Sequence, residues 1–146
     1  MRCLVERYHD ISSGHRVVGH EGKCVHLHGH NYRIHFFCEL SGPEALDSVG
    51  RVVDFGVIKD RLCRWLEDHW DHGFLVWDAD PLLPALVEID PQGIVIVPFN
   101  PTAELMARHL VEVVGPTVLA GTEVVLCRCR VEETRKCSAV YVRMDV

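Results

Sequence analysis

Polar and apolar residues alternate along several segments of the chain, and these segments predict strands. The clearest alternation runs over residues 28–40, where one face would carry His28, His30, Tyr32, Ile34, Phe36, Cys38 and Leu40. Period two over this length indicates a strand with one buried face. Residues 124–133 alternate too, with an inward face of Val125, Cys127, Cys129 and Val131. Residues 1–12 and 138–146 predict two further strands, and residues 134–137 make a hairpin-like connection.

Two other segments have the spacing of amphipathic helices. The first helix face would carry Val57, Ile58, Arg61, Leu62, Trp65 and Leu66, with Asp54 as its N-cap. The second would carry Leu105, Met106, His109, Leu110, Val113 and Val114. Asn100 and Pro101 fit the cap and first position of this helix, and Gly115-Pro116 should end it. Residues 93–98 are compatible with a short extra strand before it.

The order of these elements predicts an α+β fold. Two strands precede the first helix, and two strands follow the second helix. Sequential strands with half-buried faces favour an antiparallel arrangement with helices on the apolar side. We therefore expect a four-stranded antiparallel sheet with two helices on one face. We find no internal repeat and no linker, so residues 1–146 are expected to form a single domain.

Composition then excludes several classes of protein. The chain has 146 residues, 48% of them hydrophobic and 25% charged, with a formal net charge of -6. These fractions exclude a disordered or collagen-like chain. No apolar run approaches the roughly 18 residues that cross a bilayer, and the first residues become charged too early for a signal-peptide core. The acidic balance argues against a nucleic-acid partner, since such binding depends on Lys and Arg contacts to phosphates.

Cysteine and histidine are both unusually frequent. The chain holds 7 cysteines, and an odd number without an export signal indicates reduced thiols in the cytoplasm rather than a disulfide framework. It also holds 10 histidines, and several of them fall between residues 15 and 30. Metal binding and catalysis are therefore the uses to test.

The first candidate site is a histidine cluster. His28 and His30 would project from one strand face about 7 Å apart along the chain, and Gly29 between them allows close approach on the opposite side. His15 follows the first strand and could be a third ligand, which would leave a fourth metal position open to water or substrate. The alternative is that these histidines merely satisfy hydrogen bonds within the fold.

Three further groups could carry chemistry. Cys24 stands beside Lys23 in a glycine-flanked loop, a cationic setting that would favour a thiolate able to act as nucleophile or base; the alternative is an inert thiol, the commoner state of a lone cysteine. Asp71-His72 follows the first helix and is either an acid–imidazole pair or an ordinary polar loop. Strand parity places Glu133 on the inward face, where a carboxylate needs a partner or a function. If the strand ends at Glu132 instead, Glu133 is solvated.

Together these pieces resemble the 6-pyruvoyl-tetrahydropterin synthase / 6-carboxy-tetrahydropterin synthase family. The resemblance rests on His15, the block Cys24-Val-His-Leu-His-Gly-His-Asn-Tyr32, Val52-Val-Asp-Phe55, Asp71-His72, Asn100-Pro-Thr-Ala-Glu104 and Glu133-Thr134. It implies a tunnelling fold whose subunits close into a barrel, as a trimer or a stacked hexamer, with active sites at subunit contacts. It also implies that His15, His28 and His30 bind Zn²⁺, that Cys24 is the general base with Asp71 and His72 as relay partners, and that Glu133 anchors the pterin with Thr102 assisting.

The implied substrate is 7,8-dihydroneopterin triphosphate. Three residues separate Cys24 from His28, a spacing that resembles the 6-carboxy branch of queuosine and 7-deazapurine biosynthesis. That branch is a lyase that yields 6-carboxy-5,6,7,8-tetrahydropterin, triphosphate and acetaldehyde. The alternatives are a pyruvoyl product, formed by triphosphate elimination alone, and a zinc-containing pterin-binding protein without turnover.

Two departures from the family pattern bear on the substrate. Val76 stands where the family commonly has Asn, and residues 76–98 look longer and more divergent than usual. For the triphosphate, Lys23, Arg16 and His20 are candidates by proximity alone.

Overall fold

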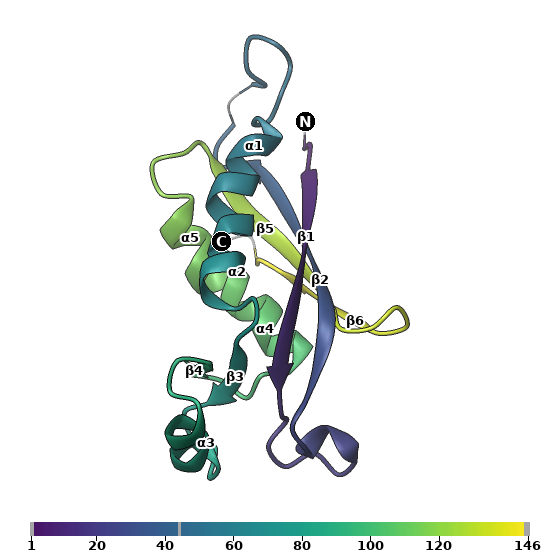
Figure 1. Ribbon diagram of the computed structural model, residues 1–146. Helices are drawn as coiled ribbons and strands as arrows, with labels where there is room; N and C mark the ends of the chain where they lie inside the picture. Colours follow the sequence, from purple (N-terminus) through teal and green to yellow (C-terminus); the bar gives the residue numbers. More distant parts are fainter. Residues whose placement is uncertain (1, 44, 145–146) are drawn as a thin grey trace.

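The computed structural model describes residues 2–43 and 45–144. These residues form one six-stranded sheet in the order β4–β3–β1–β2–β5–β6. The strands are β1 (Val5–His15), β2 (His28–Leu40), β3 (Phe74–Trp77), β4 (Ile94–Val97), β5 (Val124–Glu132) and β6 (Ser138–Val142). The strands β1, β2, β5 and β6 pair antiparallel, whereas β3 runs parallel to β1 and β4 runs parallel to β3. The long strands curl along their length (Figure 1).

The α+β class is confirmed, but the prediction of a four-stranded antiparallel sheet is wrong. The long strands β1, β2, β5 and β6 correspond to the four expected strands, and β4 corresponds to the short strand considered at residues 93–98. The strand β3 was missed, because a run of four apolar residues does not reveal its structure by periodicity. The parallel pair β3–β4 extends the sheet only at the His15 end of β1.

Two long helices cover one face of the sheet (Figure 1). The first comprises α1 (Phe55–Ile58), a wide π-helical turn η2 (Lys59–Cys63) and α2 (Arg64–His69); the second comprises α4 (Ala103–His109), a similar turn η3 (Leu110–Val114) and α5 (Gly115–Val118). A third helix, α3 (Leu83–Ile89), lies outside this layer beside β3 and β4, and a single turn η1 (Lys23–Val25) lies in the loop between β1 and β2 (Figure 1).

The core lies between the helix layer and the inward side chains of β1, β2 and β5. Fully buried members are Ile34, Phe36, Ile58, Leu62, Leu66, Met106, Leu110 and Cys129. The alternation predicted for residues 28–40 is confirmed. In β5 the predicted parity is wrong at Val125, because a bulge opposite Phe37 and Cys38 shifts the register and turns Leu126 inward instead.

The predicted ends of the two helices were only partly correct. The Asp54 carboxylate accepts a hydrogen bond from the Gly56 amide, so the first cap is confirmed. The second helix is capped by Thr102 rather than Asn100. It also continues through Gly115 and Pro116, because the wide turn η3 accommodates the proline ring within the helix.

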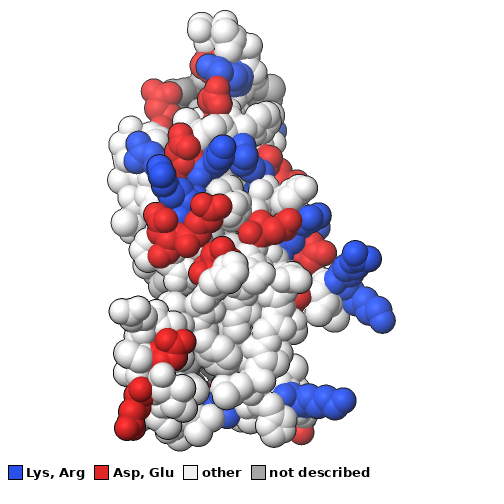
Figure 2. All heavy atoms as spheres, in the orientation of Figure 1, with Lys and Arg blue, Asp and Glu red and all other residues white. Residues whose placement is uncertain are grey.

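Charged residues of both signs are intermingled over the upper half of the face in Figure 2, and the lower middle of that face carries few charges. Lysine and arginine therefore do not gather into a basic stripe on this face. Among the described residues, no helix combines the length and apolarity needed to cross a bilayer.

Candidate functional site

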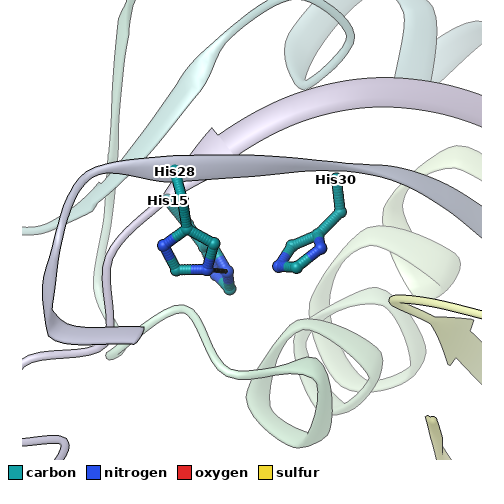
Figure 3. A group of neighbouring side chains, drawn as sticks. All are labelled: His15, His28 and His30. Atoms are coloured by element: carbon teal, nitrogen blue, oxygen red, sulfur yellow. Dashed lines mark hydrogen bonds between the residues drawn. The ribbon is translucent and has the colours of Figure 1, made fainter. Parts of the chain in front are cut away.

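Three histidines from β1 and β2 converge on the inward face of the sheet (Figure 3). His15 lies directly opposite His28 in the antiparallel register, and His30 lies two residues further along β2 on the same face. Their ligand nitrogens all lie within 4.8 Å of one another. A Cβ on Gly29 would lie 3.0 Å from the Ser13 carbonyl oxygen, so glycine permits the close approach of the strands here. The structure thus brings together the three histidines that the sequence singled out.

The hydrogen bonds of these rings fit a metal centre. The Nδ1 atom of His15 donates to the Pro101 carbonyl oxygen at 2.6 Å, and Nδ1 of His28 donates to the His26 carbonyl oxygen at 2.7 Å. Because a carbonyl oxygen only accepts, each ring in its neutral form turns an unprotonated Nε2 inward. These two Nε2 atoms are 3.0 Å apart, and the buried Nε2 of His30 has no hydrogen-bond partner among the described residues.

The protonation state supports the same conclusion. Burial lowers the pKa of His15 to about 4, so its ring is neutral near pH 7. Two facing lone pairs and a third orphaned nitrogen are unfavourable by themselves, but a shared divalent cation would satisfy all three. The backbone carbonyls that hold the Nδ1 atoms supply the outer hydrogen bonds that orient metal-binding imidazoles. The cluster could therefore hold a metal ion.

Glu133 lies on the same face. The strand β5 ends at Glu132, yet the Glu133 carboxylate reaches inward, with Oε1 3.5 Å from Nε2 of His15 and 3.6 Å from Nε2 of His30. Its side chain remains 25% exposed, so one part of the carboxylate is accessible to a ligand. The predicted inward position is confirmed.

Cys24 and Thr102 flank this region. Cys24 is half-buried in η1. Burial is the main cause that raises the pKa of Tyr32, and the electrostatic influence of Glu133 and Cys24 adds to the shift. The hydroxyl of Thr102 accepts a hydrogen bond from the Leu105 amide at 3.2 Å, so Thr102 caps the N-terminus of α4. Thr102 directly follows Pro101, whose carbonyl oxygen accepts the hydrogen bond from His15.

Asp71 and His72 form a pair on the opposite face. The Asp71 carboxylate accepts from the Ser12 amide at 2.9 Å, and its other oxygen lies 3.1 Å from Nδ1 of His72. His72 has a φ of 60°, a left-handed conformation that lets these adjacent side chains meet. The pair borders a groove of about 530 Å³ lined by outward residues of β1 and β2, including Asp10, Asn31 and Arg33.

The structure therefore divides the predicted site residues into two groups. His15, His28, His30 and Glu133 lie on the inward face and Cys24 lies in the loop between β1 and β2, whereas Asp71 and His72 border the groove on the outward face. Within the described residues, Cys24 makes no hydrogen bond or ion pair with Asp71 or His72. The family resemblance implies that Cys24, Asp71 and His72 act together, but within a single chain Cys24 and the Asp71–His72 pair lie in two separate parts of the structure.

Sequence analysis missed several residues that shape this region. The hydroxyl of Tyr32 is buried beside the histidines without a hydrogen-bond partner among the described residues. Asn100, which we expected to cap α4, instead exchanges two hydrogen bonds of 3.0 Å with the backbone of Val18. Asp80 is buried and pairs with Arg16. The Asn100–Val18 and Asp80–Arg16 contacts join residues far apart in the chain, so no local signal could have predicted them.

Comparisons with known proteins agree with this site. The sequence profile described as 6-pyruvoyl tetrahydropterin synthase matches residues 4–144. A Rickettsia felis protein named 6-carboxy-5,6,7,8-tetrahydropterin synthase is 32% identical over 129 residues, which cover 88% of this chain and 91% of that protein. A Halobacterium salinarum protein, named as a probable enzyme of the same activity, is 40% identical over 115 residues, which cover 75% and 71% of the two chains.

Solved structures support the fold. An uncharacterized protein from Wolinella succinogenes superposes with a TM-score of 0.83 at 23% identity, covering 99% of each chain. The 6-pyruvoyl tetrahydropterin synthase of Caenorhabditis elegans superposes with a TM-score of 0.69 at 22% identity, covering 99% of this chain and 97% of that one. With a profile match over nearly the whole chain, and curated relatives above 30% identity, this chain belongs to the 6-pyruvoyl tetrahydropterin synthase family of enzymes.

Proposed function

We propose that this protein is a zinc-dependent lyase that converts 7,8-dihydroneopterin triphosphate to 6-carboxy-5,6,7,8-tetrahydropterin, with release of triphosphate and acetaldehyde. One water molecule is consumed and hydrogen is redistributed within the substrate, so no redox cofactor is required. The product would serve queuosine and related 7-deazapurine biosynthesis.

The observation that carries this proposal is the convergence of three histidine ring nitrogens beside the Glu133 carboxylate. Three protein ligands leave a metal position for substrate, which is typical of a catalytic rather than a structural zinc site. The curated relatives at 32% and 40% identity carry the name of the 6-carboxy activity, which favours that branch.

In this proposal His15, His28 and His30 hold the zinc ion. When bound, zinc supplies a Lewis acid that lowers the pKa of a coordinated hydroxyl group. Glu133 would hold the 2-amino-4-oxo edge of the pterin, because a carboxylate can accept two parallel hydrogen bonds from such an edge. Thr102, at the start of α4, would assist in binding this ring.

Cys24 would act as the general base that removes a proton from the substrate side chain. Asp71 and His72 would relay protons, since the carboxylate orients the imidazole at 3.1 Å. The leaving triphosphate then departs as the carbon–oxygen bond to the side chain breaks.

The proposal includes self-association, as a trimer or a hexamer, that completes the active site. The loop that carries Cys24 in one copy and the groove bordered by Asp71 and His72 in another would meet where two copies join. The strand edges support this. Within the described residues β6 pairs only with β5, and β3 pairs with β1 only at Gly14 and His15. Unpaired edges of this length favour pairing with another strand.

We also propose a cytoplasmic location for the enzyme. All 7 cysteines are free thiols in the structure, which fits a reducing compartment.

Mass spectrometry of the products tests the proposed function. Zinc-loaded protein incubated with 7,8-dihydroneopterin triphosphate should give 6-carboxy-5,6,7,8-tetrahydropterin together with acetaldehyde, and the Cys24→Ala variant should give neither while retaining zinc. A 6-pyruvoyl product without acetaldehyde would support triphosphate elimination alone. Bound but unchanged substrate would instead support a pterin-binding protein without turnover.

A further inference from the structure

A buried ion pair links the loop before Cys24 to the segment after β3. The guanidinium of Arg16 donates from Nε to one carboxylate oxygen of Asp80 at 2.6 Å and from Nη2 to the other at 2.7 Å. The side chain of Asp80 is 0% exposed and that of Arg16 is 12% exposed. A two-pronged pair of this geometry fixes both the position and the plane of the guanidinium.

Asp80 is itself held firmly. Its carboxylate also accepts from the Leu82 amide at 2.8 Å, and its own amide donates to the Trp77 carbonyl oxygen at 3.0 Å. The Arg16 guanidinium lowers the pKa of this carboxyl below its usual range. Asp80 therefore lies in a turn anchored directly to the end of β3, inside the segment 76–98 that departs from the family pattern.

Arg16 connects Asp80 to the loop that contains Cys24. It follows His15 directly, and its remaining nitrogen, Nη1, donates to the Val25 carbonyl oxygen at 3.0 Å. The Val17 amide, on the other side of Arg16, donates to the Cys24 carbonyl oxygen at 2.8 Å. The loop is thus attached at two consecutive backbone carbonyls, those of Cys24 and Val25. In Figure 1 this loop and the β3–α3–β4 unit lie at the same end of the sheet.

These contacts also change the interpretation of Arg16. Proximity alone made Arg16 a candidate for the triphosphate, together with Lys23 and His20. Its charge is neutralised by a buried carboxylate, and three of its nitrogens are occupied within the chain. An arginine whose charge is paired and whose nitrogens are already hydrogen-bonded stabilises the protein structure and is not available to bind a phosphate.

We propose that Asp80 is a positioning residue for the reaction, acting through Arg16 to hold the loop that carries Cys24 in a fixed position relative to His15, which directly precedes Arg16. This inference rests on the proposed function, in which Cys24 is the general base. Its consequence is that the divergent segment 76–98 supports catalysis from a distance. A small displacement of a reacting group reduces turnover strongly while leaving substrate binding nearly intact.

The test uses Asp80→Asn, with Asp78→Asn as the matched control, because Asp78 is an exposed acid two residues earlier in the same turn. We expect Asp80→Asn to lower kcat by about ten- to a hundredfold, with KM and zinc content nearly unchanged. Asp78→Asn should match the parent protein. Asp80→Glu keeps the charge and should recover part of kcat. If Asp80→Asn does not fold, Arg16→Lys tests the same link, because lysine keeps the charge but cannot make the paired contact.

A second measurement does not depend on turnover. In a background of Cys3→Ser and Cys137→Ser, which removes the two exposed thiols, we would follow iodoacetamide alkylation of Cys24 against pH, and amide hydrogen exchange over residues 17–26. Asp80→Asn should shift the alkylation profile and speed exchange in this loop, without speeding exchange in β5.

The outcomes separate the two proposals. If the parent protein does not convert the pterin but the loop responds as expected, the proposed function fails while the link between Asp80 and Cys24 stands. Unchanged kcat, alkylation and exchange in a folded Asp80→Asn variant would overturn the positioning role. A loss of stability alone, with kcat unchanged, would also overturn it.

Discussion

The histidine cluster and the Asp71–His72 pair are built in contrasting ways. The cluster comes from two adjacent strands whose register puts His15 opposite His28, and its rings are buried or half-buried. The pair comes from a turn between a helix and a strand, and the His72 side chain is 82% exposed. One chain therefore completes the candidate metal centre, whereas it leaves the acid–imidazole pair facing an open groove.

Under the proposed self-association, this difference separates the part of the site that one copy forms from the part that a second copy would complete. Strand pairing fixes the cluster within a single copy, because the ligand positions follow from the backbone register. Among the described residues, the Asp71–His72 pair is held by hydrogen bonds to the backbone of Ser12 and Leu66 and by the ion pair between its two side chains. Metal binding and proton transfer should accordingly respond to different perturbations.

The largest effect should come from removing a metal ligand. His28→Ala should abolish turnover and lower zinc affinity by more than the roughly 10- to 100-fold caused by loss of an outer hydrogen-bond partner, as measured by metal analysis after dialysis. His26→Ala is the matched control, because His28 uses only the backbone carbonyl of His26. Full zinc occupancy in His28→Ala would show that the cluster is not the metal centre.

Loss of an acid–base residue should separate activity from metal content. Cys24→Ala and His72→Ala should each lower kcat by about 10²- to 10⁴-fold, the usual contribution of a positioned proton donor or acceptor. Both variants should keep the zinc content of the parent protein, because neither residue belongs to the cluster. Loss of zinc in His72→Ala would contradict the division of the site into two parts.

A smaller effect is expected where β1 supports the turn. The hydroxyl of Ser13 donates to the Gly73 carbonyl oxygen at 2.9 Å in a partly buried setting. Ser13→Ala should lower the free energy of unfolding by about 1 kcal/mol, measured by urea denaturation. The zinc content should not change. A loss above about 3 kcal/mol would exceed a single hydrogen bond and would mean that the turn and the cluster are coupled.

The smallest effect should appear in the pH dependence of stability. Burial opposes ionisation of Asp71, but the Ser12 amide and His72 outweigh it, so the pKa of Asp71 lies below its usual value of 3.8. The folded pKa is depressed, so the stabilisation is present above the unfolded pKa and is lost as the pH falls through the folded pKa. The parent protein should therefore be more stable than Asp71→Asn at pH 6, and this difference should shrink below about pH 4. A difference that grows on acidification would contradict this assignment.

The part of the fold that was predicted correctly is the part with local periodicity. The bounds of β2 match the alternation at 28–40, and the histidine cluster follows from that alternation together with the position of His15. The inward side chain of Glu133 also followed from parity, even though β5 ends one residue earlier. Where one face of a strand is buried, the sequence carries enough information to place its side chains.

The errors share a different cause, which is competition from distant contacts. Asn100 and Thr102 are both suitable N-cap residues. The side chain of Asn100 is hydrogen-bonded to the backbone of Val18, so Thr102 caps the helix instead. Val125 was misplaced because a bulge interrupts the pairing of β2 and β5. His72 has a φ of 60°, which lets its side chain meet that of Asp71, and Asp80 pairs with Arg16. Both features depend on tertiary packing, which no local sequence pattern predicts.

Complementation between inactive variants tests most directly whether two copies share one active site. Cys24→Ala and His72→Ala chains carrying different tags would be refolded together in equal amounts, and their co-assembly checked by sequential purification. If each site takes Cys24 from one copy and His72 from another, random mixing should restore about one quarter of the parent activity, because each intact partner is drawn with a chance of about one half. Mixed assemblies that bind zinc but stay as inactive as the separate variants would contradict the proposal that two copies share one active site.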